Sequence, residues 1–175
     1  MRPSVRPQQQ AHTRILALDY GRARIGLAIA DVETSLARPM DTLERVNRNE
    51  DMRRLRELVR ENGVKQIIVG LPLRLDGSRG EMADEASRFA ERVRKQIGVP
   101  VEMVDERLTS WEAERLLEEL GGRVMKAAPA RRVGKHVEHE MRNTPAPGKM
   151  SVDAVAAAVM LNEYLEQHRP GGVSI

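Results

Sequence analysis

Three acidic residues stand where a carboxylate could take part in chemistry. Asp19 and Glu106 each follow a short apolar run, and Asp153 comes near the start of a final helical pattern. In α/β proteins, strand ends and helix starts can meet at one sheet edge, where ligands bind. Converging carboxylates repel one another unless a cation lies between them, and hard oxygen ligands suit Mg²⁺ or Mn²⁺. Two such ions, about 3.5–4 Å apart, can activate a water and stabilise the leaving oxygen of a phosphodiester.

Local roles could also explain each of these acids. Asp19 could brace the turn that follows it, and the helix dipole favours Asp153 in a first helical turn. Glu106 could pair with a neighbouring arginine. Asp105 is an equally good ligand by position, because strand alternation lets only one of the two face a given side. The spacing alone therefore leaves the choice between Asp105 and Glu106 open.

The apolar pattern predicts an α/β fold with a mixed central sheet flanked by helices. Two apolar runs separated by four residues are typical of a β-hairpin, and later strands alternate with amphipathic helices as α/β crossovers. Pro39 favours an edge position for the third strand. We expect strands at 14–19, at 24–31, within 35–43, at 66–70 and at 99–104. We expect helices at 50–62, at 80–97, from 109 or 110 to 120, and after an N-cap at Ser151.

One domain accounts for most of the 175 residues, because domains commonly contain about 100–200 residues. We expect a domain at 13–168 that contains a basic flexible insertion at 121–150, with flexible tails at 1–12 and 169–175. Cysteine is absent, which excludes disulfides, thiolate zinc sites and cysteine nucleophiles. No apolar run approaches the ~20 residues of a membrane span, and no secretory signal is recognisable, so we expect a soluble cytoplasmic protein without a membrane partner.

Positive charge is concentrated in two segments of a chain whose net charge is only +3. Residues 1–18 carry three Arg and no acid, and residues 121–150 carry seven Lys or Arg and two Glu. The remainder of the chain is net acidic. This division is compatible with a nucleic-acid partner and with a cation site in the acidic body.

Four stretches resemble the YqgF/RuvX family, whose members are described as pre-16S rRNA nucleases or RuvC-like Holliday junction resolvases. They are LDYGRARIGLA (18–28), VGLP (69–72) with DG (76–77), DERLT (105–109) and DAVAA (153–157). The resemblance covers 13–122 and 149–166. It implies a ribonuclease H-like fold and a metal-dependent endonuclease in which Asp19, Glu106 and Asp153 bind Mg²⁺ or Mn²⁺. It also implies trimming of the 5′ end of precursor 16S rRNA, with four-way DNA junctions as the rival substrate.

Six neighbouring residues are candidate substrate contacts. A glycine in the turn after Asp19 would let a phosphate approach closely, because it has no Cβ. Arginines can grip phosphate oxygens, a lysine near the last helix could neutralise charge on the scissile phosphate, and a Gly and a Pro at a strand end would shape a rigid loop. These candidates are Gly21, Arg24, Gly70, Pro72, Arg107 and Lys149.

Two features of the chain depart from the family pattern, and two other functions are compatible with the sequence. Ala156 stands where RuvC-type sites usually have a fourth acidic or histidine ligand. The basic loop before the last helix is longer than the usual link of the family, and it could be either a substrate-clamping arm or a solvated insertion. An actin-like ATPase or sugar kinase would also fit the hairpin that follows Asp19. A non-catalytic RNA-binding or ribosome-assembly factor would fit the charge pattern. Cutting two strands of a junction would need two active sites and therefore a homodimer. Because the sequence shows no dimer face, the oligomeric state, monomer or homodimer, stays open.

Overall fold

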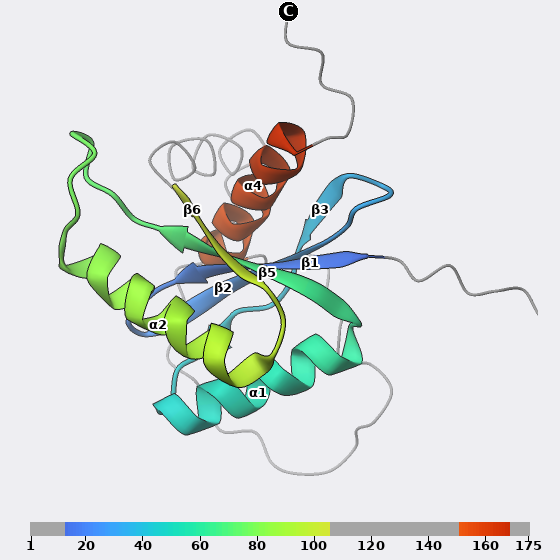
Figure 1. Ribbon diagram of the computed structural model, residues 1–175, viewed down its shortest axis with the longest axis horizontal. Helices are drawn as coiled ribbons and strands as arrows, with labels where there is room; N and C mark the ends of the chain where they lie inside the picture. Colours follow the sequence, from blue (N-terminus) through green and yellow to red (C-terminus); the bar gives the residue numbers. More distant parts are fainter. Residues whose placement is uncertain (1–12, 106–150, 169–175) are drawn as a thin grey trace, which may run out of the picture.

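A mixed sheet forms the centre of the computed structural model, which describes residues 13–105 and 151–168. Five of its six strands lie side by side in the order β3 (Leu36–Pro39), β2 (Arg24–Asp31), β1 (Arg14–Tyr20), β5 (Val64–Leu71) and β6 (Val101–Asp105) (Figure 1). A short β4 (Leu43–Glu44) pairs with β2. Strands β1, β5 and β6 are parallel, whereas β2 is antiparallel to β1. The predicted hairpin with α/β crossovers is confirmed.

Helices cover both faces of this sheet (Figure 1). The first face carries α1 (Arg48–Glu61) and α2 (Glu81–Ile97), and the opposite face carries α4 (Val152–Gln167). As predicted, Ser151 caps α4, because its hydroxyl oxygen accepts a hydrogen bond from the backbone N–H of Ala154 at 3.1 Å. This cap fixes where the last helix begins and therefore where Asp153 lies.

The two faces of the sheet are packed with side chains of different size. On the α1 and α2 side, the core consists mainly of Leu, Ile, Val and Phe. On the α4 side, small side chains line both surfaces: Ala17, Ala28, Ala30 and Ala37 from the strands and Ala157 and Ala158 from the helix. Small residues let the helix backbone come close to the strands, which becomes important at the candidate site.

The third predicted strand differs from the observed structure. The segment within 35–43 forms two separate strands, β3 and β4, both paired with β2. Pro39 ends β3 because proline has no N–H to donate to a strand ladder, and β3 lies at the sheet edge as predicted. The predicted helix ending at 120, the insertion at 121–150 and both tails lie outside the described residues.

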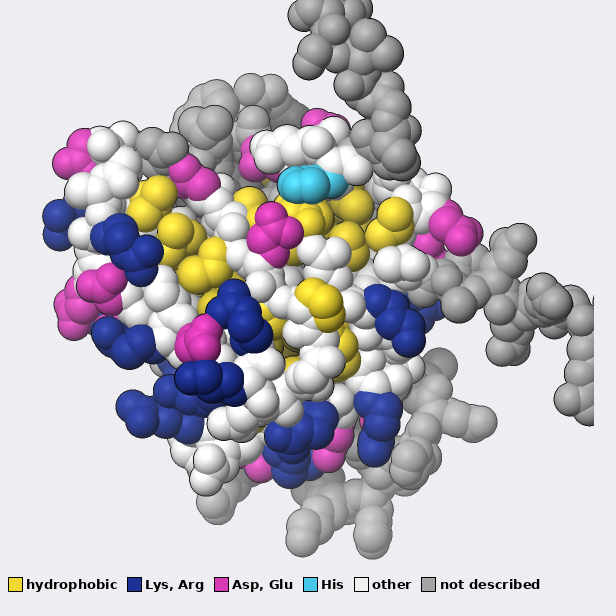
Figure 2. All heavy atoms as spheres, viewed as in Figure 1, with side chains coloured by type: hydrophobic (Ala, Val, Ile, Leu, Met, Phe, Trp, Pro, Cys, Tyr) yellow, Lys and Arg dark blue, Asp and Glu magenta, His cyan; other side chains and the backbone are white. Residues whose placement is uncertain are grey.

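Charged side chains of both signs lie next to one another over α1 and α2 (Figure 2). On α1, for example, Arg53 contacts Glu50 at 2.7 Å and Glu57 at 2.6 Å. This face of the described structure therefore carries many ion pairs. Within the described ranges, no helix is both long enough and apolar enough to cross a bilayer.

Candidate active site

Asp19 lies near the end of β1, on the face of the sheet that α4 covers. Along this strand, Ile15 and Ala17 belong to the core beneath α4, whereas Leu16 and Leu18 belong to the opposite core. Because side chains alternate along a strand, position 19 is directed to the α4 side. The Asp19 side chain is half-buried there, near the opening of the β1–β2 turn.

Gly26 brings Asp153 to the same place. It lies directly opposite Asp19 in the β1–β2 ladder. A Cβ added to Gly26 would lie 2.1 Å from the carbonyl oxygen of Asp153 and 3.0 Å from the Asp153 Cβ. The first turn of α4 therefore rests on β2 at this glycine, and any side chain would push the helix away.

This contact limits the distance between the two carboxylates. Residues directly opposite in an antiparallel pair have Cβ atoms about 4.5–5.5 Å apart, so the Cβ atoms of Asp19 and Asp153 are at most about 8.5 Å apart. Two aspartates with Mg–O distances of about 2.0–2.1 Å can span that separation around one cation. The structure thus brings two of the three predicted ligands together on one edge and one face.

Asp153 has a cationic neighbour. Arg24 Nε donates a hydrogen bond to Asp153 Oδ2 at 3.0 Å, and the two side chains are 43% and 34% exposed. A partly exposed pair of this kind contributes only about 0–1 kcal/mol, so a divalent ion or a phosphate can compete with it. No described residue donates a hydrogen bond to the other oxygen, Oδ1.

The donor set therefore fits a hard divalent cation, although its third predicted member is not described. Within residues 13–105 and 151–168, no three His, Asp or Glu side chains gather closely enough to hold a metal ion. Glu106 lies outside these ranges, as do Arg107 and Lys149. Asp19 and Asp153 supply only carboxylate oxygens, the ligands that Mg²⁺ and Mn²⁺ prefer.

The alternative ligand Asp105 lies on the other face of the sheet. In β6, Val104 packs against the α4-side core, whereas Val101 and Met103 pack against the opposite core. Alternation therefore directs Asp105 away from Asp19 and Asp153. The sequence spacing leaves open whether Asp105 or Glu106 is the third ligand. The orientation of β6 disfavours Asp105.

Gly21 has a structural reason to be glycine besides the predicted approach of a phosphate. A Cβ at this position would lie 2.5 Å from the carbonyl oxygen of Arg24. The tight β1–β2 turn therefore excludes any side chain there. The predicted phosphate contact at Gly21 stays a prediction.

Gly70 and Pro72 lie where the sequence predicts a shaped loop. Gly70 is buried near the end of β5 and pairs with Val104 of β6. The preceding residue, Val69, pairs with Leu18 of β1, which places Gly70 level with Asp19. The loop after Pro72 is closed by a hydrogen bond from the Arg74 N–H to the Ser78 carbonyl at 3.0 Å. These residues thus border the edge that holds the two carboxylates.

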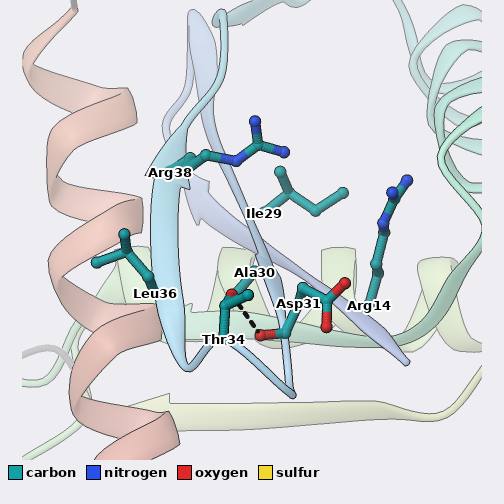
Figure 3. A pocket seen from close by; sticks show the side chains of 7 residues that line it. All are labelled: Arg14, Ile29, Ala30, Asp31, Thr34, Leu36 and Arg38. Carbon is teal, nitrogen blue, oxygen red and sulfur yellow. Dashed lines mark hydrogen bonds between the residues drawn. The ribbon is translucent and has the colours of Figure 1, made fainter. Parts of the chain in front are cut away.

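A separate pocket lies at the other end of the hairpin (Figure 3). Its lining includes Arg14 at the start of β1 and Asp31 at the end of β2, which are opposite each other in the ladder. Arg14 and Asp19 are five residues apart on one strand, about 17 Å at 3.3–3.4 Å per residue. The pocket is therefore distinct from the candidate active site.

Comparisons with known proteins identify the family of this chain. The family model described as "RuvX: Holliday junction resolvase" matches residues 13–135. The chain belongs to the RuvX family. A RuvX relative from Chloroflexus aurantiacus, named "Putative pre-16S rRNA nuclease", is 37% identical over 155 residues, which are 89% of this chain and 88% of that protein. A relative with the same name from Anaeromyxobacter sp. strain K is 40% identical over 157 residues, 90% of this chain and 99% of that protein.

The solved structure of Thermus thermophilus RuvC covers 89% of this chain and 95% of its own, at 15% identity and a TM-score of 0.49. Membership of the RuvX family confirms the predicted family, and the mixed sheet with helices on both faces agrees with the expected ribonuclease H-like α/β fold. Membership of this family also confirms the predicted class of activity, that of a nucleic-acid-hydrolysing enzyme.

Sequence reasoning assigned no role to Gly26, although it lies within the RuvX-like stretch. A glycine inside an apolar strand pattern often marks a close approach of another backbone, and this signal could have identified it. Sequence reasoning also missed Arg45, which contacts the turn beside Asp19, and Asp51, which pairs with Arg45; both lie outside the family motifs. No local pattern distinguishes these two from the many other arginines and acids of the chain.

Proposed function

We propose that this RuvX protein is a divalent-metal-dependent endonuclease and that Asp19, Glu106 and Asp153 hold Mg²⁺ or Mn²⁺. The observation that carries this proposal is the contact of Gly26 with the Asp153 backbone, because it brings two carboxylates from distant parts of the chain to one place. Repulsion between converging carboxylates is relieved by a bound cation.

Glu106 is the third ligand of the proposal. It follows the last residue of β6, and Val104, two positions earlier, packs on the α4 side. Continued alternation by one residue would bring a carboxylate at position 106 to the face of Asp19 and Asp153. Orientation of the strand supports Glu106 over Asp105 as the ligand.

The side chains around the carboxylates divide the remaining tasks. Divalent ions bound there would supply a water activated for attack and stabilisation of the leaving oxygen. Arg24, already 3.0 Å from Asp153, would turn to a non-bridging oxygen of the scissile phosphate. Arg107 and Lys149 would place positive charge next to the same phosphate. Gly21, Gly70 and Pro72 would shape the protein backbone along which the nucleic-acid strand lies.

We propose precursor 16S rRNA as the substrate, with cleavage at its 5′ end. Relatives that share 37–40% of their residues with this chain over nearly their whole length carry the name of a pre-16S rRNA nuclease. The family description, in contrast, names Holliday junctions. Four-way DNA is therefore the comparison substrate, and its cleavage would need two active sites in a homodimer.

A cleavage assay with both substrates tests the proposal. Purified protein is given a precursor rRNA fragment or a four-way DNA junction while Mn²⁺ is titrated. We expect metal-dependent cutting of the rRNA precursor and little cutting of the junction. Preferred cutting of the junction would transfer the proposal to DNA. Binding of rRNA without any cutting, at every metal concentration, would instead support a non-catalytic assembly factor.

A further inference from the structure

An ion pair between a buried aspartate and a half-buried arginine lies beside the β1–β2 turn. Asp51 is the one fully buried charged residue among those that the structure describes, at 1% exposure. Its Oδ2 accepts a hydrogen bond from Arg45 Nε at 3.2 Å, and its Oδ1 accepts one from the Val46 N–H at 3.1 Å. Asp51 lies in the first turn of α1, so this helix fixes the position of the arginine.

The far end of the Arg45 guanidinium contacts three consecutive residues of the turn. Its Nη1 lies 2.9 Å from the hydroxyl of Tyr20, 3.2 Å from the carbonyl oxygen of Gly21 and 3.4 Å from that of Arg22. The guanidinium carbon also lies 4.9 Å from the centre of the Tyr20 ring. A single side chain therefore holds the backbone that directly follows Asp19.

A second helix, α2, also contacts this turn. Glu85 of α2 accepts a hydrogen bond from Arg22 Nη2 at 2.8 Å and one from the Tyr20 hydroxyl at 3.4 Å. The arginine lowers the pKa of the Glu85 carboxyl, so this carboxylate is ionised at neutral pH. The turn is thus tied to α1 through Arg45 and to α2 through Glu85.

We propose that Arg45 is a positioning residue of the nuclease site, acting through the turn that it holds. This inference rests on the proposed function. Burying the Asp51 carboxylate is costly, and a well-packed apolar residue could stabilise the fold as well or better, so stability alone does not explain the pair. The distinctive property of arginine is its rigid, planar fork of donors. Anchored by Asp51, that fork fixes the carbonyls of residues 21 and 22, and with them the end of β1 that carries Asp19.

Two variants and a control test this role. Arg45→Met removes every donor, and Arg45→Lys keeps the charge but loses the fork. Misplacing a catalytic group by about 1 Å can reduce the rate about 10²-fold, so we expect kcat to fall about 10- to 100-fold with Mn²⁺ in excess, while KM changes by less than about threefold. Arg53→Met is the control, because it also removes two ion pairs from α1, but on the exposed side. It should leave kcat unchanged.

Hydrogen exchange of the turn amides gives a readout that does not depend on cleavage. We expect faster exchange at residues 20–24 in Arg45→Lys, with the remainder of the sheet protected as in the wild type. Should Arg45→Met fail to fold, Arg45→Lys carries the test, because its ammonium can still pair with Asp51. Wild-type kcat together with wild-type exchange in Arg45→Lys would overturn the inference, as would a loss of activity equal to the unfolded fraction.

The two proposals fail in different ways. If the wild-type protein cuts no nucleic acid, the proposed function is wrong, and Arg45 then has no catalytic site to position. If the wild-type protein cuts and the Arg45 variants cut equally well, only the positioning role is wrong. Mn²⁺ affinity, measured by calorimetry without substrate, adds a third readout: we expect weaker binding in Arg45→Lys and unchanged binding in Arg53→Met.

Discussion

Gly26→Ala is the substitution whose effect on the position of Asp153 follows most directly from the structure. The new Cβ would lie 2.1 Å from the Asp153 carbonyl oxygen and 2.4 Å from its carbonyl carbon, whereas ordinary contacts begin at 3.4 Å. Both atoms belong to the backbone and cannot rotate away. The first turn of α4 must therefore retreat from β2 by about 1.3 Å, and Asp153 must retreat with it.

This retreat should affect catalysis more than stability. A displacement of about 1 Å can reduce kcat about 10²-fold when it separates groups that act together. Overpacking typically costs about 1–3 kcal/mol, which corresponds to a Tm decrease of about 2–12 °C in a domain of this size. We therefore expect a folded variant that binds nucleic acid, has a moderately lower Tm and cuts about 10²-fold more slowly at saturating Mn²⁺.

Gly80→Ala is the matched control. The atoms nearest to a Cβ at Gly80 would belong to the Arg74 side chain, with Nε at 3.3 Å, and that side chain can move aside. Its kcat should remain within about twofold of the wild-type value. Wild-type kcat in Gly26→Ala, measured on protein shown to be folded by circular dichroism, would refute the claim that this contact sets the position of Asp153.

Three further predictions concern the ligands, the metal and the surface. Asp19→Asn should abolish cleavage while folding and nucleic-acid binding are retained; unchanged cleavage by the purified variant would remove Asp19 from the mechanism. Mn²⁺ or Mg²⁺ should support cleavage and Ca²⁺ should support little, because Ca²⁺ accepts looser geometry; full activity in EDTA would exclude the metal scheme. Hydrogen bonds from Arg53 and Arg54 lower the pKa of Glu50 to about 2, so this interaction stabilises the fold above the usual pKa of 4.5 and is lost as the pH falls towards 2. Denaturant titrations should therefore find Glu50→Gln less stable than the wild type at pH 6, with a difference that shrinks below pH 4.5; a difference that is independent of pH would contradict this.

Local patterns were sufficient to predict most of the elements. The apolar runs before Asp19 and Asp105 become β1 and β6, and the Ser151 cap marks the start of α4 as expected. Such features depend on residues close together in the chain, where periodicity and capping act. The exception is the third strand, because residues 40–42 separate β3 from β4 in a way that only pairing with β2 reveals.

Contacts between distant segments could not be predicted in the same way. The sequence predicts Arg24 as a phosphate contact, yet in the folded chain its side chain bonds Asp153, 129 positions away. Likewise, Arg22 meets Glu85 63 positions later. With 29 basic and 26 acidic residues in the chain, charge type alone leaves too many possible pairs. Sheet register and the docking of α4 choose among them, and both are properties of the folded molecule.

Diffraction from crystals soaked in Mn²⁺ gives the most direct test of the carboxylate metal site, because the anomalous signal locates the ion without reference to activity. We expect an Mn²⁺ peak bound by the carboxylates of Asp19 and Asp153, with Glu106 as a further ligand and with Arg24 displaced from Asp153. An Mn²⁺ peak elsewhere, or an Asp153 that keeps its pair with Arg24 at saturating Mn²⁺ while the protein cuts nucleic acid, would contradict it.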